Sequence, residues 1–377
     1  MLKRLGIFLR DGWLMIGLTL GLFLALEGAY RLQAAIRRRP IQGPAVDSTL
    51  HPYHGQAWFQ EFNDGPDGLP GRKYHLDPFR FHWPDPQSSR WLNIDSAGRR
   101  LTVSSVTDSA TALRVFMLGG SAMWGFAARD SQTIPSLLAG RLRARGIDNV
   151  IVENLAQAGF TVMQEANTFT LELARGHVPD AAVFLDGYND MATTFRYGEP
   201  GHTYDEDRAE QKIRLGSRGF WSELLGLGRH SQLVQRLLPA PPDQDRAGAE
   251  VCPGLAAWYR AIVRETEAVG REYGVSVIFL QQPFHATSRK PRSAWESGFS
   301  RAPAFAACAA ALDSAMADRT GRTYFRAYTL FDQDTATVFV DRHSHITEAA
   351  GEVVADTIAG ILAPMLRARR ATGARPR

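Results

Sequence analysis

Apolar runs and longer amphipathic stretches alternate along the chain from residue 112 onward. Short apolar runs predict β-strands at 113–118, 149–154, 181–186, 275–281 and 323–328, and stretches of helical character fall at 133–145, 161–176, 254–273, 303–320 and 347–369. The predicted strands show little polar alternation, which is typical of parallel strands buried on both faces. The order therefore predicts an α/β fold, a doubly wound parallel sheet of about five strands with helices on both faces.

The first hydrophobic segment is of a different kind. Residues 12–32 are almost uncharged and follow a short basic segment, 1–11. As a helix, residues 12–30 would span roughly 28 Å, close to the hydrocarbon thickness of a bilayer. We predict one membrane helix at 12–32 after a cytoplasmic N-terminus. A cleaved signal peptide is the alternative, although no clear cleavage site is visible. Basic residues flank the segment on both sides, so their distribution does not fix its orientation.

The region between the membrane segment and the first strand is rich in proline and aromatic residues. Proline interrupts long helices, whereas a disordered linker would be poorer in aromatics. We therefore expect residues 33–111 to form an irregular region packed on a main domain at 112–369. Core or interface packing is favoured for its aromatics over the lining of a substrate groove. Residues 195–253 interrupt the alternation and predict an insertion or lid, and 370–377 form a basic tail.

Composition narrows the function classes. The 377 residues are 45% hydrophobic, enough for one large core with additions, and the net charge is +4. No nucleic-acid motif is visible, so the basic excess favours a membrane surface or an anionic polymer over DNA. The only cysteines, Cys252 and Cys308, exclude a disulfide scaffold and a multi-cysteine zinc site. They could form one bridge in an exported chain, and the sequence leaves this open.

Candidate chemistry begins where the first predicted strand ends. Gly119, Gly120 and Ser121 follow an apolar run, and small residues allow a sharp turn into a helix. A hydroxyl on such a turn lies at the carboxyl edge of the sheet, where backbone N–H groups at a helix N-terminus can stabilise an oxyanion. The alternative is an ordinary helix N-cap. Two further polar clusters, at 154–159 and 187–190, follow the next two predicted strands and fall at the same edge.

A fourth polar cluster precedes the last predicted helix and contains Asp341, His343 and His345. A serine hydroxyl becomes nucleophilic when an imidazole takes its proton, and a carboxylate holds the tautomer of that imidazole. Asp341 with a histidine can supply this pair. The two histidines could instead bind metal, but no compact set of further ligands accompanies them.

These four blocks resemble the SGNH/GDSL hydrolase family, and more narrowly its membrane-anchored bacterial members. Gly119-Gly120-Ser121 is similar to the nucleophile block, with glycine where many members have aspartate. Gly159 matches the second block, 187–190 the third and 341–345 the last. The resemblance covers residues 91–361. One departure is that three residues separate Asp341 from His345, where the family usually has two.

The resemblance implies a role for each site residue. Ser121 would be the nucleophile, and the N–H groups of Ser121 and Gly159 with the Asn189 amide would form an oxyanion hole. His345 would be the base and Asp341 its partner. The sequence context favours His345 over His343, because His345 precedes an Ile-Thr pair and a glycine as the family's histidine does.

The sequence therefore predicts a serine esterase acting on an oxygen ester through an acyl-enzyme, without metal or organic cofactor. Its substrate would be an acyl ester, and a glycan or a lipid could carry that ester. The resemblance places it in a bacterial inner membrane as a single-pass protein with a periplasmic or extracytoplasmic catalytic domain. An O-acyltransferase acting on a surface polysaccharide is one alternative. An inactive glycan-binding or assembly protein with the same fold is the other.

Overall fold

The computed structural model describes residues 2–36, 48–104, 106, 108–204, 206, 247–299 and 302–372. The chain divides into two compact units, one of Met1–Ala45 with Asp205–Gln244 and one of Val46–Tyr204 with Asp245–Arg377. The described part of the first unit includes helix α1 (Leu2–Ile36), whose stretch Asp11–Ala29 is long and apolar enough to cross a membrane. The last helix, α12 (Glu348–Thr372), passes the same test, but half of its apolar stretch is buried inside the second unit.

The second unit is built on a parallel sheet of five strands in the order β4-β3-β5-β6-β7. This is the flavodoxin-like order, in which the first strand of the sheet along the chain is an inner strand and the second lies at an edge. The predicted fold class is confirmed, and all five predicted strands are present. The strands are β3 (Leu113–Gly119), β4 (Val150–Asn154), β5 (Ala181–Asp186), β6 (Ser276–Gln281) and β7 (Tyr324–Arg326).

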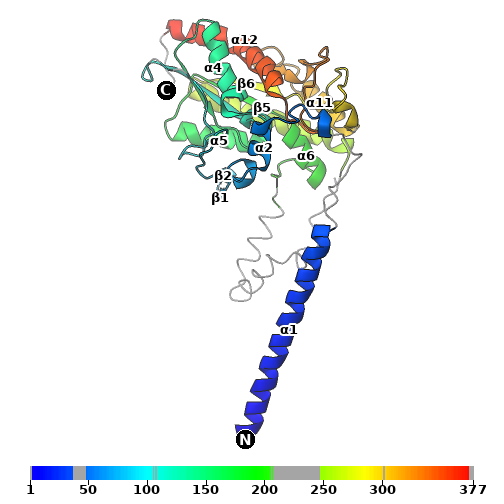
Figure 1. The fold of residues 1–377 in the computed structure, drawn as a ribbon. Helices are drawn as coiled ribbons and strands as arrows, with labels where there is room; N and C mark the ends of the chain where they lie inside the picture. The colour runs from blue at the N-terminus through cyan, green and yellow to red at the C-terminus, as the bar shows by residue number, and fades with distance from the viewer. Residues whose placement is uncertain are drawn as a thin grey trace. The chain divides into compact units, whose positions relative to one another are not determined.

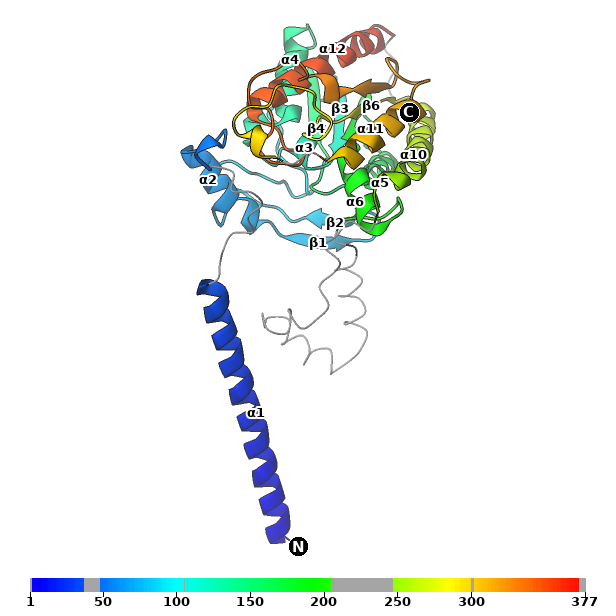
Figure 2. The same ribbon diagram turned by 90° about the vertical axis from the view of Figure 1, so that its right-hand side faces the viewer.

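Successive side chains of the inner strand β3 enter two different cores. Val115 and Met117 pack in the core with α4 (Ile134–Ala144) and α12, while Phe116 and Leu118 pack in the core with α5, α10 and α11. In Figures 1 and 2, α4 and α12 lie together above the sheet, and α5 lies below it. The sheet is thus covered on both faces, as its uninterrupted apolar strands require. The helices of the lower face are α5 (Val162–Ala174), α10 (Cys252–Glu272) and α11 (Pro303–Ala315).

One helix that the sequence did not predict follows β5. It is α6 (Tyr188–Tyr197), and it begins directly after Gly187, whose φ is +104°. The first three residues of the expected insertion at 195–253 therefore belong to this helix. Most of the rest of that expected insertion, residues 205 and 207–246, lies outside the described residues.

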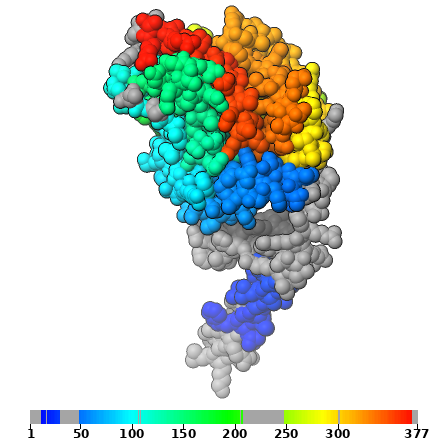
Figure 3. Space-filling view, turned by 45° about the horizontal axis from the view of Figure 1, so that its top comes forward, coloured from blue at the N-terminus to red at the C-terminus, as the bar shows by residue number. Residues whose placement is uncertain are grey.

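The aromatic region before the sheet contains α2 (Ala57–Asp64) and an antiparallel hairpin of β1 (Tyr74–Asp77) and β2 (Phe81–Pro84). Trp58 and Phe62 of α2 are buried in the upper core. The Tyr53 hydroxyl accepts the Glu348 backbone N–H at 2.6 Å, which ties this segment to the start of α12. Figure 3 shows the blue surface of this segment adjoining the orange-red surface of the chain that leads into α12.

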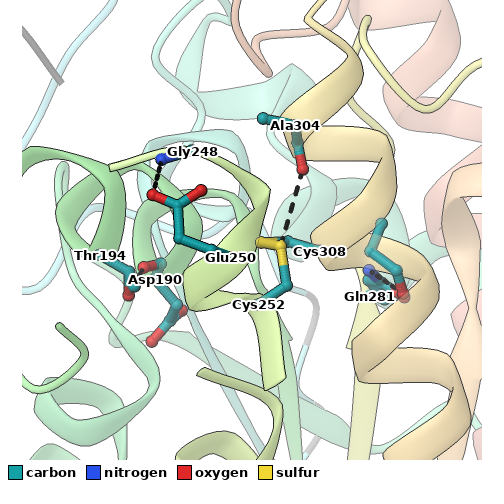
Figure 4. Close-up of a disulfide and its surroundings, with 9 residues drawn as sticks. Asp190, Thr194, Gly248, Glu250, Cys252, Gln281, Ala304 and Cys308 are labelled. Atoms are coloured by element: carbon teal, nitrogen blue, oxygen red, sulfur yellow. Dashed lines mark hydrogen bonds between the residues drawn. A yellow bond between two sulfur atoms is a disulfide. The ribbon is translucent and has the colours of Figure 1, made fainter. Parts of the chain in front are cut away.

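A disulfide joins two helices on the lower face of the sheet. Cys252 is the first residue of α10 and Cys308 lies within α11, with their Cα atoms 4.6 Å apart (Figure 4). Both cysteines are buried. The sequence alone did not decide whether this disulfide forms, and in the structure it is formed.

Candidate active site

The candidate nucleophile lies on a single helical turn at the carboxyl end of β3. This turn is α3 (Ser121–Trp124), and it ends at Gly125 in the left-handed conformation, with φ +93°. A Cβ on Gly120 would come too close to Nδ2 of Asn189, so a larger residue here would force the Asn189 side chain to shift.

His345 connects Ser121 to a carboxylate. Its Nε2 lies 2.7 Å from Ser121 Oγ, and its Nδ1 is hydrogen-bonded to Asp341. Because a carboxylate only accepts, Nδ1–H donates to Asp341 and Nε2 is left to accept the hydroxyl proton. The side chains of His345 and Asp341 remain 13% and 31% exposed, so the arrangement is open to solvent.

The environment of Asp341 favours its charged form. Burial would raise the pKa of this carboxyl, but the charge of the neighbouring His345, its hydrogen bond and the contacts from His343 hold the pKa below its ordinary value. An ionised Asp341 can stabilise an imidazolium that forms when His345 takes a proton.

A tight loop absorbs the additional residue between Asp341 and His345. The Val340 N–H donates to the His345 carbonyl at 3.0 Å, and Phe339 bridges Ile346 in antiparallel fashion. The loop thereby folds back and brings the Asp341 side chain to His345.

The other histidine of this loop has different contacts. The His343 backbone N–H donates to Asp341 Oδ1 at 2.9 Å, while its ring Nδ1 lies 2.7 Å from the Tyr188 hydroxyl. The structure thus separates the two histidines: the His345 ring contacts Ser121, and the His343 ring contacts Tyr188 in the first turn of α6.

The candidate oxyanion donors converge on the same edge. Asn189 in α6 donates through Nδ2 to the Phe160 carbonyl at 2.7 Å, and Gly159, with φ +81°, directly precedes that residue. Within the described ranges, neither the Ser121 N–H nor the Gly159 N–H donates to another group of the chain. Ser121 follows β3 and Asn189 follows β5, the strands that flank the switch point where open α/β sheets bind ligands.

A buried arginine supports the turn that carries Ser121. Arg100 donates to the carbonyls of Trp124 at 3.0 Å and Gly125 at 2.5 Å, which are the last groups of this turn. It also forms an ion pair with Asp130 at 2.9 Å. Sequence reasoning missed this role, since an Arg-Arg pair carries no signal of such a contact.

A buried ion pair supports the loop that carries Asp341. Glu296 Oε1 accepts the N–H groups of Val338 and Phe339 at 2.9 and 3.1 Å, and Oε2 lies 2.5 Å from Lys290 Nζ. Burial would raise the pKa of Glu296, but Lys290 and the backbone donors hold it below its ordinary value. Sequence reasoning missed Glu296 too, because the two backbone partners lie more than 40 residues further along the chain.

Two rings complete the surroundings of the imidazole and its carboxylate. Phe126 stacks on His345, with ring centroids 4.3 Å apart and planes 17° apart. His51 stacks on Phe59; burial lowers the pKa of His51, and the nearby charge of Asp341 opposes this shift. Within the part of the chain that the structure describes, no group of three or more His, Cys, Asp or Glu side chains is arranged to hold a metal ion.

No protein-family model matches the sequence, and no curated protein matches it. Several solved structures are similar to it. The lipase/acylhydrolase from Enterococcus faecalis is 12% identical, with a TM-score of 0.41 over 67% of this chain and 96% of that one. A catalytic mutant of an acetylxylan esterase from Geobacillus stearothermophilus is 13% identical, with a TM-score of 0.38 over 70% and 96%. A lipolytic protein of the G-D-S-L family from Veillonella parvula is 12% identical, with a TM-score of 0.38 over 66% and 97%.

This chain is similar to those hydrolases. At these identities and scores, the interpretation of the site rests on its own geometry.

Proposed function

We propose that the protein is a serine esterase that cleaves an oxygen ester through an acyl-enzyme. The observation that carries the proposal is the continuous hydrogen-bonded series from Asp341 through His345 to Ser121 at the carboxyl edge of the sheet. Nucleophile, base and orienting carboxylate are in contact, which is the arrangement that activates a serine hydroxyl.

In the proposed reaction Ser121 Oγ attacks the ester carbonyl while His345 Nε2 takes the hydroxyl proton. The negative charge that develops on the carbonyl oxygen is stabilised by the backbone N–H groups of Ser121 and Gly159 and by the Asn189 amide. Collapse of this intermediate breaks the bond to the alcohol oxygen, which receives the proton from His345. Water, activated by the same imidazole, then releases the acid from Ser121.

Hydrolysis of 4-nitrophenyl esters by the full-length chain in detergent tests this proposal. Ser121→Ala and His345→Ala should each lower kcat/KM by at least about 1000-fold, and Asp341→Asn by as much or less. His343→Ala is the matched control and should cost less than about tenfold, because its ring contacts Tyr188. If the two histidine variants rank in the opposite order, His343 is the base.

The same assay separates the alternatives. Acyl transfer to an added sugar acceptor, in place of release of the free acid, would identify an O-acyltransferase that uses the same acyl-enzyme. Absence of turnover in the parent with short and long acyl chains would favour an inactive binding protein.

We further propose that α1 anchors the protein in a membrane and that the body from Val46 onward lies outside the cytoplasm. The apolar stretch Asp11–Ala29 supports the anchor. The Cys252–Cys308 disulfide supports export, since disulfides persist in oxidising compartments such as the bacterial periplasm and are rare in the cytosol.

A further inference from the structure

An arginine lies one ring away from the candidate base. Arg72 precedes the hairpin strand β1, and its Cζ lies 4.7 Å from the centroid of the Trp124 ring and 5.8 Å from that of Phe126. Phe126 stacks on His345 at 4.3 Å, so the two separations together place Arg72 Cζ within about 10 Å of the imidazole.

Among the described residues, no carboxylate balances the positive charge of Arg72. Its Nε donates to the Leu69 carbonyl at 3.3 Å, while Nη1 is buried and meets no acceptor among the described residues. Within the same set of residues Arg72 forms no ion pair with a carboxylate. Burial lowers the pKa of Arg72, and the hydroxyl of the adjacent Tyr74 opposes the shift.

A second buried donor belongs to the ring on which Arg72 stacks. Trp124 is fully buried, and its Nε1–H also meets no acceptor in the part of the chain that the structure describes. The same indole packs against Arg100 at 4.5 Å, but Arg100 is balanced by Asp130. Of the two guanidinium groups on this ring, Arg100 has a carboxylate partner, and Arg72 has none among the described residues.

Unsatisfied buried donors are rare because each costs free energy, and they call for a partner. Arg72 and Trp124 offer donors only, so the missing partner must accept hydrogen bonds. A neutral hydroxyl would satisfy the donors but leave the charge of the guanidinium unbalanced, whereas an anionic oxygen satisfies both.

We propose that Arg72, which stacks on the Trp124 ring, binds an anionic group, a carboxylate or phosphate, carried by the ester that Ser121 attacks. This inference rests on the proposed esterase function and adds a substrate class to it, an ester that bears a negative charge within about 10 Å of the imidazole. The anionic group would fix the register of the substrate, with the ester carbonyl at Ser121.

The test compares two esters of equal chain length, neutral 4-nitrophenyl pentanoate and anionic 4-nitrophenyl hydrogen glutarate, with inorganic phosphate as a competing anion at constant ionic strength. Arg72→Gln should lower the ratio of kcat/KM for the anionic ester to that for the neutral ester by about tenfold to hundredfold, as expected for one charge-assisted hydrogen bond. It should also weaken inhibition by phosphate by about tenfold or more. Arg72→Lys keeps the charge and should retain part of both effects.

Arg90 provides the matched control. It is an exposed arginine that also stacks on a tryptophan, with Cζ 4.4 Å from the Trp91 ring, and Arg90→Gln should leave the ratio and the phosphate inhibition at parental values. The proposal is wrong if Arg72→Gln matches Arg90→Gln in both measurements.

A binding measurement distinguishes failure of the esterase proposal from failure of the anion-site proposal. Inorganic phosphate should raise the melting temperature of the parent and of Arg90→Gln but not that of Arg72→Gln. A parent that hydrolyses neither ester would contradict the esterase proposal, while this shift would still report the anion site. Equal shifts in all three proteins would overturn the anion site alone.

Discussion

Replacing Glu165 with glutamine should stabilise the protein above pH 6 and change it little near pH 4. Glu165 in α5 is buried together with Asp186 and Asp190, at the edge of the sheet that carries the candidate site. Asp186 accepts a hydrogen bond from the Tyr259 hydroxyl at 2.5 Å, and Asp190 accepts the Val162 N–H at 3.0 Å. Among the described residues, no cationic side chain forms an ion pair with any of these three carboxyls.

The direction of the effect follows from the pKa values. Burial, and then the charges of Asp186 and Asp190, raises the pKa of Glu165 well above its ordinary value of 4.5. The folded protein therefore holds a proton that the unfolded chain releases as the pH rises through about 4.5. The free energy of unfolding falls over that interval, from the unfolded pKa up to the folded pKa, and glutamine removes this loss.

The size of the expected change in the free energy of unfolding can be taken from Asp190. Burial raises its pKa from 3.8 to about 6, against the opposing backbone hydrogen bonds. A difference of this size corresponds to about 3 kcal/mol of unfolding free energy lost above pH 6. Glu165 experiences the charges of both aspartates in addition to burial, so its loss has the same sign. On the scale set by Asp190, and allowing about 1 kcal/mol for the buried amide, Glu165→Gln should gain on the order of 2 kcal/mol at pH 8.

Denaturant unfolding of the full-length chain in detergent, followed by tryptophan fluorescence between pH 4 and 8, measures this difference. Glu172→Gln on the same helix is the matched control with the opposite sign. Burial would raise the pKa of Glu172, but His177 and the guanidinium groups of Arg99 and Arg175 hold it below its ordinary value. Glu172→Gln should therefore destabilise the protein at neutral pH, and the loss should shrink below the unfolded pKa of 4.5. A Glu165→Gln difference that stays constant with pH would refute the reasoning.

Two further predictions concern export and anchoring. Reduction of Cys252–Cys308, which are 56 residues apart, should lower the free energy of unfolding by about 4 kcal/mol, because the bridge closes a long loop in the unfolded chain; a double alanine variant should not respond to reductant, and an equal response from both proteins would argue against the bridge. A reporter active only in the periplasm, fused after Arg39, should give signal, with the full-length chain recovered in the membrane fraction. A soluble chain beginning near Ala35 would instead favour a cleaved signal peptide.

The sequence predicted the sheet well because its strands are continuous apolar runs. It missed α6, since the residues at 187–190 together have the composition of a turn. Such a composition gives no local signal that a helix begins there. In the structure Asn189 and Asp190 are buried by contacts with α5 and the loop before it, and these contacts hold the helix in place. Tertiary packing decided the conformation here, and no local pattern reports it.

The site could be predicted to the extent that its residues follow strand ends or precede a helix. Ser121 and His345 lie at such positions, and parallel strands bring such positions to one edge. Arg72, Arg100 and Glu296 could not be predicted, because each acts through partners distant in sequence. The direct contact between Glu296 and the backbone before Asp341, for example, depends on how two loops pack.

Labelling of Ser121 tests the central claim most directly. The full-length chain in detergent should react with a serine-directed fluorophosphonate, and peptide mass spectrometry should place the adduct on Ser121. Ser121→Ala should remain unlabelled, and His345→Ala should react far more slowly, because its hydroxyl has lost the base 2.7 Å away. Labelling of Ser121→Ala at the parental rate, or an adduct on another residue, would contradict the account.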